Sequence, residues 1–152
     1  MANVAAATAM ARSAGVEPDR IREAIRNFRL DAHRIELVAE ANGVRWIDDS
    51  KATNPHAANA SLASFDRVVW IVGGLLKGVD ISSLVERHKA SLAAAIVIGE
   101  DRAAVLEALA NKAPGVPVEE IASGAGSDVM QAAVEAAGRY AAEGDVVLLA
   151  PA

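Results

Sequence analysis

Residues 68–74 read Val-Val-Trp-Ile-Val-Gly-Gly, an uninterrupted apolar run that ends in two glycines. Such a run, without alternating polar residues, is typical of a strand buried on both faces of a sheet. Similar short runs recur at 94–98, 116–121 and 146–149. Amphipathic helices are expected between the runs, at 55–65, 81–91, 101–112 and 127–142. This alternation predicts an α/β fold, a Rossmann-like three-layer sandwich with a mostly parallel sheet.

The segment before this alternation has a different character. Residues 35–40 and 44–48 are typical of short strands, and the Asn42-Gly43 dipeptide between them is a strong signal for a β-hairpin turn. Two helices are expected further upstream, over 4–14 and 17–28. This helical hairpin is too small to hold a core of its own, and the compositional boundary after it lies near residues 30–34.

Composition excludes several classes of protein. The chain has 152 residues, with 15 Lys+Arg against 20 Asp+Glu and a net charge of −5, so no nucleic-acid partner is expected. The absence of cysteine excludes disulfides, thiolate metal sites and thiol catalysis. The sequence has no apolar stretch of the roughly 18 residues that suggest a membrane span, so we expect no membrane partner and a cytoplasmic protein.

Ligands of open α/β sheets bind beyond the carboxyl ends of the strands, which directs attention to the loops there. The first loop, residues 48–55, reads Asp-Asp-Ser-Lys-Ala-Thr-Asn-Pro. Asn54 can cap the next helix, whose amides then face the loop, while Lys51 and Thr53 add a cation and a hydroxyl donor. Asp49 could accept from ribose hydroxyls or orient Lys51. The alternative is a capped turn with a surface ion pair, which stabilises a protein by only about 0–1 kcal/mol.

The second loop, residues 73–78, reads Gly-Gly-Leu-Leu-Lys-Gly. Its glycines can let the backbone approach a ligand, and Lys77 stands alone among apolar residues. The loop matches neither the P-loop nor the dinucleotide fingerprint, and a strand exit with an exposed lysine explains it equally well. The loops at 99–102 and 122–127 are more typical of turns with helix caps.

The histidines and tryptophans say less about chemistry. We expect His88 to be solvated, because Arg87 and Lys89 flank it, and we expect Trp46 and Trp70 to be core residues. His33 and Arg34 are adjacent and could together meet a phosphate. The sequence shows no metal-ligand signature, so no metal site is predicted.

Three segments together carry a resemblance to a known family. They are His33 to Glu36, residues 42–55 (Asn-Gly-Val-Arg-Trp-Ile-Asp-Asp-Ser-Lys-Ala-Thr-Asn-Pro) and the loop at 73–78. In this order and spacing they resemble the Mur ligase family, and the similarity extends over nearly the whole chain, to Leu-Leu-Ala-Pro-Ala at its end. The resemblance implies an ATP-dependent ligase that adds D-glutamate to UDP-N-acetylmuramoyl-L-alanine through an acyl phosphate, in peptidoglycan synthesis.

The resemblance also implies a domain organisation. Residues 1–32 would be the helical tail of a central ATP-binding domain, and residues 33–152 a C-terminal, amino-acid-binding Rossmann-like domain truncated at its end. The missing N-terminal and central domains would be the partners of this chain. ATP and magnesium would be required, with the magnesium ligands outside this chain, and the chain alone would be inactive.

The roles of individual residues are implied in the same way. Asp49 would contact the ATP ribose, and Lys51 would lie near the nucleotide as a catalytic group. Thr53 and Lys77 would each hold one carboxylate of D-glutamate. The remaining nucleotide-side residues would be Arg34, His33 and, on the adenine side, Asn3.

Two alternatives stay open at this point. The chain could be a stand-alone nucleotide- or anion-binding module of the Rossmann type. It could also belong to a Mur ligase that adds a different amino acid.

Overall fold

The computed structural model describes residues 2–28, 31–122 and 126–152. It divides the chain into two compact units, Met1–Asp31 and Ala32–Ala152. The first unit is a helical hairpin of α1 (Ala2–Ser13) and α2 (Pro18–Asn27), as predicted. Gly15 lies between the two helices at a φ of 80°, a conformation that glycine adopts without steric cost. Pro18 begins α2 because its fixed φ suits the first helical turn, where a missing N–H costs nothing.

The second unit contains one six-stranded sheet. Its strands are β1 (Glu36–Ala41), β2 (Val44–Asp48), β3 (Val68–Gly74), β4 (Leu92–Gly99), β5 (Val118–Glu120) and β6 (Val146–Leu149). The strand order is β1-β2-β6-β3-β4-β5, in which β1 and β2 are antiparallel and every other neighbouring pair is parallel. The predicted α/β fold with a mostly parallel sheet and a preceding β-hairpin is therefore confirmed.

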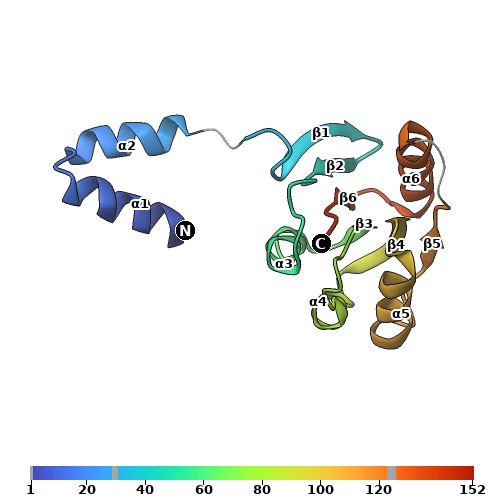
Figure 1. Ribbon diagram of the computed structural model, residues 1–152. Coiled ribbons are helices and arrows are strands. Elements are labelled where there is room, and N and C mark those ends of the chain that lie inside the picture. The colour runs from blue at the N-terminus through green and yellow to red at the C-terminus, as the bar shows by residue number, and fades with distance from the viewer. Residues whose placement is uncertain (1, 29–30, 123–125) are drawn as a thin grey trace. The chain divides into compact units, whose positions relative to one another are not determined.

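Helices cover both faces of this sheet. Three helices, α3 (Pro55–Leu62), α4 (Ser82–His88) and α5 (Arg102–Lys112), pack on one face, and α6 (Gly126–Tyr140) packs on the other (Figure 1). Trp70 points into the core under α3, α4 and α5, whereas its neighbour Ile71 points into the core under α6. Strand β3 must be apolar at every position because successive side chains enter opposite cores. No described helix has the length and apolar character that a bilayer crossing would require.

Element ends lie within three residues of their predicted positions, and β5 is the element that is shortened most in proportion to its length. A strand was expected over 116–121, but β5 has only three residues, Val118–Glu120. Pro117 accounts for the late start, because proline has no N–H to donate to a sheet. Its carbonyl oxygen still accepts a hydrogen bond from the Ala95 amide at 2.9 Å, so the chain already contacts β4 one residue before regular pairing begins.

The β-hairpin has the predicted turn and one unpredicted irregularity. Asn42 and Gly43 have φ values of 53° and 73°, as a two-residue type I′ turn requires. The pairing runs regularly from the turn to Ala39, which lies opposite Trp46. The next residue of β2, Ile47, lies opposite Leu37 and not opposite Val38. Val38 is thus an extra, bulged residue. The shift brings Glu36 opposite Asp48, which matters for the site below.

The prediction that His88 is solvated is wrong. His88 is only 7% exposed, and its ring Nε2 lies 3.0 Å from Oδ1 of Asn59, a residue of α3. The neighbouring charges on α4 could not reveal this burial, because it depends on where α3 lies. Burial lowers the pKa of His88 below its ordinary value of 6.5, and the positive charge of Arg87 lowers it further.

This burial predicts a specific pH dependence of stability. Because the folded state holds a proton on His88 less readily than the unfolded chain does, the free energy of unfolding should fall as the pH decreases from above 6.5 to below it. In the variant His88→Gln, whose amide can still donate to Asn59, this part of the pH dependence should disappear. Urea unfolding of both proteins at several pH values measures it, and parallel curves would contradict the assignment.

Candidate functional site

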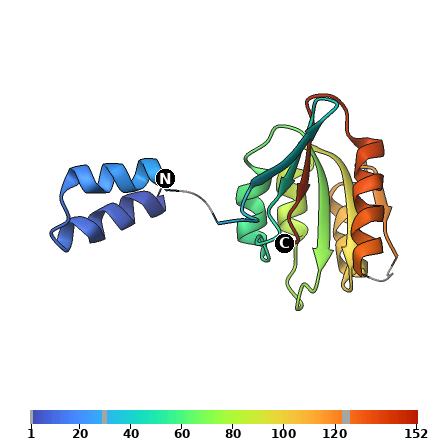
Figure 2. The same cartoon turned by 90° about the horizontal axis from the view of Figure 1, so that it is seen from above.

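The carboxyl ends of β2, β6 and β3 lie next to one another at one edge of the sheet, and Figure 2 shows β3 ending at the same edge as the C-terminus. Backbone hydrogen bonds tie the loops that leave this edge to the short segment 150–152. Ala152 donates its N–H to the carbonyl oxygen of Ala52 at 2.9 Å, and Gly73 donates to that of Pro151 at 3.2 Å. The two predicted lysine loops are therefore attached to a single segment between them.

The first loop combines a buried carboxylate with two exposed polar residues. Asp49 is 6% exposed, and its Oδ2 accepts a hydrogen bond from the hydroxyl of Ser61 on α3. Lys51 and Thr53 are exposed. Asn54 caps α3 as predicted, because its Oδ1 accepts from the Ala57 amide at 2.9 Å. The loop thus places a lysine and a hydroxyl beside the amino-terminal end of α3, an arrangement that suits an anionic ligand.

The second loop is held by the turn between β4 and α5. The carbonyl oxygen of Gly74 accepts from the amides of Glu100 and Asp101 at 3.1 and 3.0 Å. Asp101 stands at the N-cap position of α5 but makes no side-chain cap hydrogen bond, and its carboxylate accepts from the Leu76 amide at 2.6 Å. Leu76 is buried, whereas Lys77 is exposed and has a φ of 54°. The loop is therefore anchored at Gly74 and Leu76, immediately before an exposed lysine.

A hollow of about 360 Å³ lies between this loop and α5. Three of the residues that line it are acidic, Asp80, Asp101 and Glu107. An acidic ligand would be repelled there, because like charges at short range disfavour each other. The hollow is therefore a poor candidate for a dicarboxylate site, and the lysine-bearing edge is the better one.

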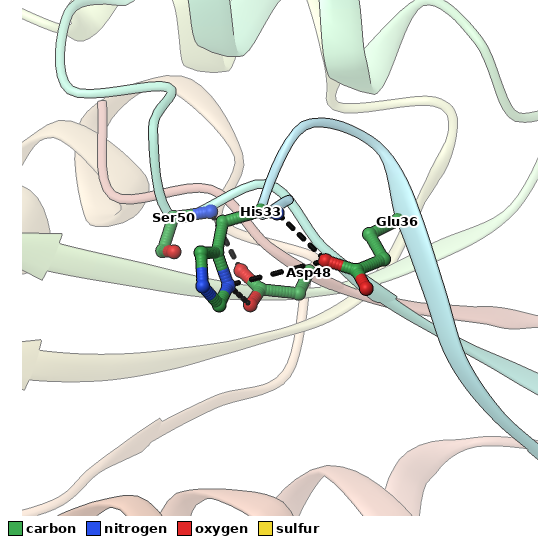
Figure 3. Close-up of polar contacts among 4 residues, drawn as sticks. All are labelled: His33, Glu36, Asp48 and Ser50. Carbon is green, nitrogen blue, oxygen red and sulfur yellow. Dashed lines mark hydrogen bonds and ion pairs between the residues drawn. The ribbon is translucent and has the colours of Figure 1, made fainter. Parts of the chain in front are cut away.

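A third group of polar residues lies beside the first loop and was not predicted. His33 Nδ1 is 2.6 Å from Asp48 Oδ2, and Glu36 Oε2 accepts from the His33 amide at 2.7 Å (Figure 3). Asp48 Oδ1 accepts from the Ser50 amide at 2.8 Å. Burial raises the pKa of Asp48, but the hydrogen bonds from His33 and Ser50 outweigh it and hold that pKa below its ordinary value. The group depends on the register of the hairpin, which shifts at Val38, and no local sequence signal indicated that shift.

Three residues of this group lie close enough together to be compared with the ligands that a magnesium ion requires. One ligand atom from each of His33, Glu36 and Asp48 lies within 4.8 Å of the others. Magnesium prefers near-octahedral oxygen ligands and keeps several waters. Here one ligand is an imidazole nitrogen, and both carboxylates already accept hydrogen bonds from within the group. The residues do not fit a magnesium ion.

The other predicted site residues are more scattered. Arg34 is exposed in the turn before β1, next to His33. Asn3 lies exposed on α1, in the Met1–Asp31 unit, whereas the other predicted site residues belong to the Ala32–Ala152 unit. Of the predicted loop at 122–127, residues 123–125 lie outside the described residues.

A mostly parallel sheet with lysines at its carboxyl edge defines the chain as an α/β domain of the Rossmann-like class, with its candidate site where such sheets bind ligands. Comparison with known families is more specific. The protein-family model described as "Mur ligase, glutamate ligase domain" matches residues 33–152. The chain belongs to the Mur ligase family.

Several curated relatives that the chain resembles share the name UDP-N-acetylmuramoylalanine--D-glutamate ligase. The relative from Leifsonia xyli subsp. xyli is 54% identical over 152 residues, which are 100% of this chain and 29% of the relative. The relative from Thermobifida fusca is 50% identical and is covered to 32%. The relative from Mycobacterium tuberculosis strain H37Rv is 46% identical over 97% of this chain and is covered to 35%. The chain spans about a third of the length of these relatives.

A solved structure shares the fold at much lower identity. It is the crystal structure of the UDP-N-acetylmuramate-alanine ligase from Thermotoga maritima, with a TM-score of 0.68 and 16% sequence identity. The match covers 98% of this chain and 33% of that chain. At this identity the likeness supports the fold alone.

Proposed function

We propose that this chain is the amino-acid-binding part of an ATP-dependent ligase that adds D-glutamate to UDP-N-acetylmuramoyl-L-alanine. One observation carries the proposal: the loops that bear Lys51 and Lys77 are both tied to the segment 150–152 at one sheet edge. The names of relatives that are 46–54% identical support the choice of amino acid and acceptor. Such an enzyme works in the cytoplasm, where ATP is available.

The proposed division of labour follows from charge and position. D-glutamate carries two carboxylates, so one would be held by the Thr53 hydroxyl and the other by the Lys77 ammonium group. Its amine attacks the carbonyl carbon of the acyl phosphate to form a tetrahedral intermediate, and the nitrogen loses a proton to solvent. The bond from that carbon to the phosphate oxygen then breaks, and phosphate leaves. Negative charge accumulates on the oxygens of this intermediate. Lys51 would stabilise that charge, the kind of preorganised electrostatic contribution that is often the largest in catalysis.

The nucleotide side would be formed by the neighbouring residues. Asp49 would accept from the ATP ribose, with its carboxylate oriented by Ser61. His33, Arg34 and Asn3 would complete this side. Residues 1–32 would belong to the central ATP-binding domain and residues 33–152 to the C-terminal domain. Magnesium would be held by residues outside this chain, as the resemblance to the family implies.

The chain alone should not catalyse the reaction. When it is mixed with ATP, magnesium, UDP-N-acetylmuramoyl-L-alanine and D-glutamate, we expect no phosphate above the enzyme-free rate, because the ATP-binding domain would be absent. A coupled phosphate assay measures this, with the longer ligase as positive control. Sustained turnover by the isolated chain would overturn the assignment of this chain as one part of the enzyme.

Two further measurements separate the alternatives. Titration with ADP should show weak or undetectable binding to the isolated chain, whereas micromolar binding would favour a stand-alone nucleotide module. In the longer ligase, D-glutamate should support turnover where L-alanine and meso-diaminopimelate do not. Turnover with one of the latter would place the chain in a Mur ligase for another amino acid.

A further inference from the structure

His33 is held at two points by residues of the β-hairpin. Its ring Nδ1 lies 2.6 Å from Asp48 Oδ2, and its backbone N–H donates to Glu36 Oε2 at 2.7 Å (Figure 3). Asp48 is held in turn by the Ser50 amide, which donates to its other oxygen at 2.8 Å. The carbonyl oxygen of His33 accepts from the Lys51 amide at 3.4 Å. This chain of contacts fixes the imidazole beside the first lysine loop.

The contact with Asp48 decides which ring nitrogen carries the proton. An ionised carboxylate can only accept hydrogen bonds, so Nδ1 must donate to it. The pKa of Asp48 lies below its ordinary value, which keeps this carboxylate ionised at neutral pH. In the neutral ring the other nitrogen, Nε2, then holds a lone pair and acts as an acceptor. The side chain of His33 is 58% exposed, so a ligand can reach that nitrogen.

We propose that Asp48 is a positioning residue that locks His33 in its Nδ1–H tautomer, so that Nε2 accepts a hydrogen bond from a ribose hydroxyl of the bound nucleotide. The inference rests on the proposed function, in which His33 lies on the nucleotide side. A ribose hydroxyl is the matching group because a neutral acceptor nitrogen needs a donor, and phosphate oxygens at neutral pH are acceptors. Glu36 Oε2 also lies 4.0 Å from the His33 Nδ1, which is beyond hydrogen-bond distance, so the choice of tautomer depends on Asp48 at 2.6 Å.

The position of the proton on the His33 ring distinguishes this arrangement from a metal site. A cation bound by His33, Glu36 and Asp48 would take the Nδ1 lone pair, because metals bind a deprotonated ring nitrogen. The remaining proton would then lie on Nε2. The two possibilities therefore predict opposite tautomers of the same ring.

The tautomer can be measured in the 152-residue chain by long-range ¹H–¹⁵N correlation spectra of the imidazoles, above the pH at which they titrate. His33 should show the Nδ1–H pattern, with and without magnesium. His88 is an internal control that should show the opposite tautomer. The Arg87 guanidinium, which can only donate, contacts Asn59 Oδ1 and so identifies that atom as an acceptor. His88 Nε2, which contacts the same oxygen, must therefore carry the proton. An Nε2–H pattern for wild-type His33 would overturn the proposal.

Two isosteric variants test the cause. Asp48→Asn removes the charge but retains an oxygen for the Ser50 amide, and it should shift His33 away from the Nδ1–H form. Glu36→Gln keeps an acceptor for the His33 amide and should leave the tautomer unchanged. An unchanged tautomer in Asp48→Asn would overturn the role of Asp48. So would an equal shift in both variants, because it would indicate a general loosening of the hairpin.

The functional part is tested in the longer ligase. Asp48→Asn should raise the KM for ATP about tenfold, the factor expected for weakening one hydrogen bond, and leave the KM for D-glutamate unchanged. Glu86→Gln on α4 is the control for loss of a carboxylate. If the tautomer is as expected but the KM for ATP does not change, the nucleotide contact is refuted while the positioning of His33 stands. If the longer protein shows no ligase activity at all, the proposed function fails independently of the tautomer.

Discussion

Replacing Gly73 with alanine should destabilise the Ala32–Ala152 unit by about 4 kcal/mol or more, a large part of the roughly 5–15 kcal/mol that stabilises a typical protein. A Cβ at this position would lie 2.0 Å from the carbonyl oxygen of Ile98 and 3.0 Å from its carbonyl carbon. Both atoms belong to the backbone of β4, which pairs with β3 at this point. Relief would require the two central strands to separate. The φ of 122° adds strain for any residue with a side chain.

The adjacent glycine supplies a matched control. Gly74 has a φ of 143°, but a Cβ there would meet no atom within 4 Å. Gly74→Ala therefore carries the backbone strain without the overlap and should cost only about 1–3 kcal/mol. Urea unfolding followed by circular dichroism compares the two variants at one pH. Equal losses would show that strain, and not crowding against β4, accounts for the glycine at 73.

Gly73 also illustrates how sequence and structure divide the explanation. The sequence suggested that the glycines of this loop let the backbone approach a ligand. The structure gives Gly73 a different role, because its missing Cβ leaves room for the carbonyl of the neighbouring strand. A glycine next to a strand end signals close approach of something, but the local sequence does not say of what. Only the pairing of β3 with β4 identifies the neighbour.

Features of the fold that depend on local sequence were predictable. Three of the four apolar runs became central strands, and the fourth became the edge strand β5. The type I′ turn formed at Asn42-Gly43 because that dipeptide tolerates positive φ at both positions. The bulge at Val38 could not be predicted. Without it the pairing would continue regularly from the turn, and Leu37 would lie opposite Asp48 in place of Glu36. The polar group around His33 depends on that single extra residue.

The candidate site was predictable as far as topology determines it. Loops that follow parallel strands lie at one edge of the sheet, so the lysine loops could be expected on the same side. Their attachment to the segment 150–152 required knowledge that β6 inserts between β2 and β3, which no local pattern encodes. Likewise, the anchoring of Leu76 by Asp101 joins residues that are far apart in the sequence and meet only because β3 pairs with β4.

Replacing Lys77 with alanine in the longer ligase should raise the KM for D-glutamate about 10- to 100-fold. A hydrogen bond to a charged group contributes about 1.5–3 kcal/mol, which corresponds to this range. The KM for ATP should change much less, because the proposed nucleotide contacts come from other residues. Steady-state phosphate release, with each substrate varied in turn, measures both constants. Since alanine keeps a β-carbon at the φ of 54°, the substitution adds no backbone strain beyond that of lysine.

Lys89→Ala controls for the loss of a positive charge. Lys89 follows the carboxyl end of α4, near the start of β4 and therefore at the opposite edge of the sheet, where it pairs with Glu86 at 2.7 Å. Its removal should leave both constants unchanged. Lys77→Arg should recover part of the loss in Lys77→Ala, because it restores the charge but not the compact ammonium group. An effect of Lys77→Ala confined to ATP would refute the assignment of Lys77 to D-glutamate, since the two lysine loops would then serve one ligand.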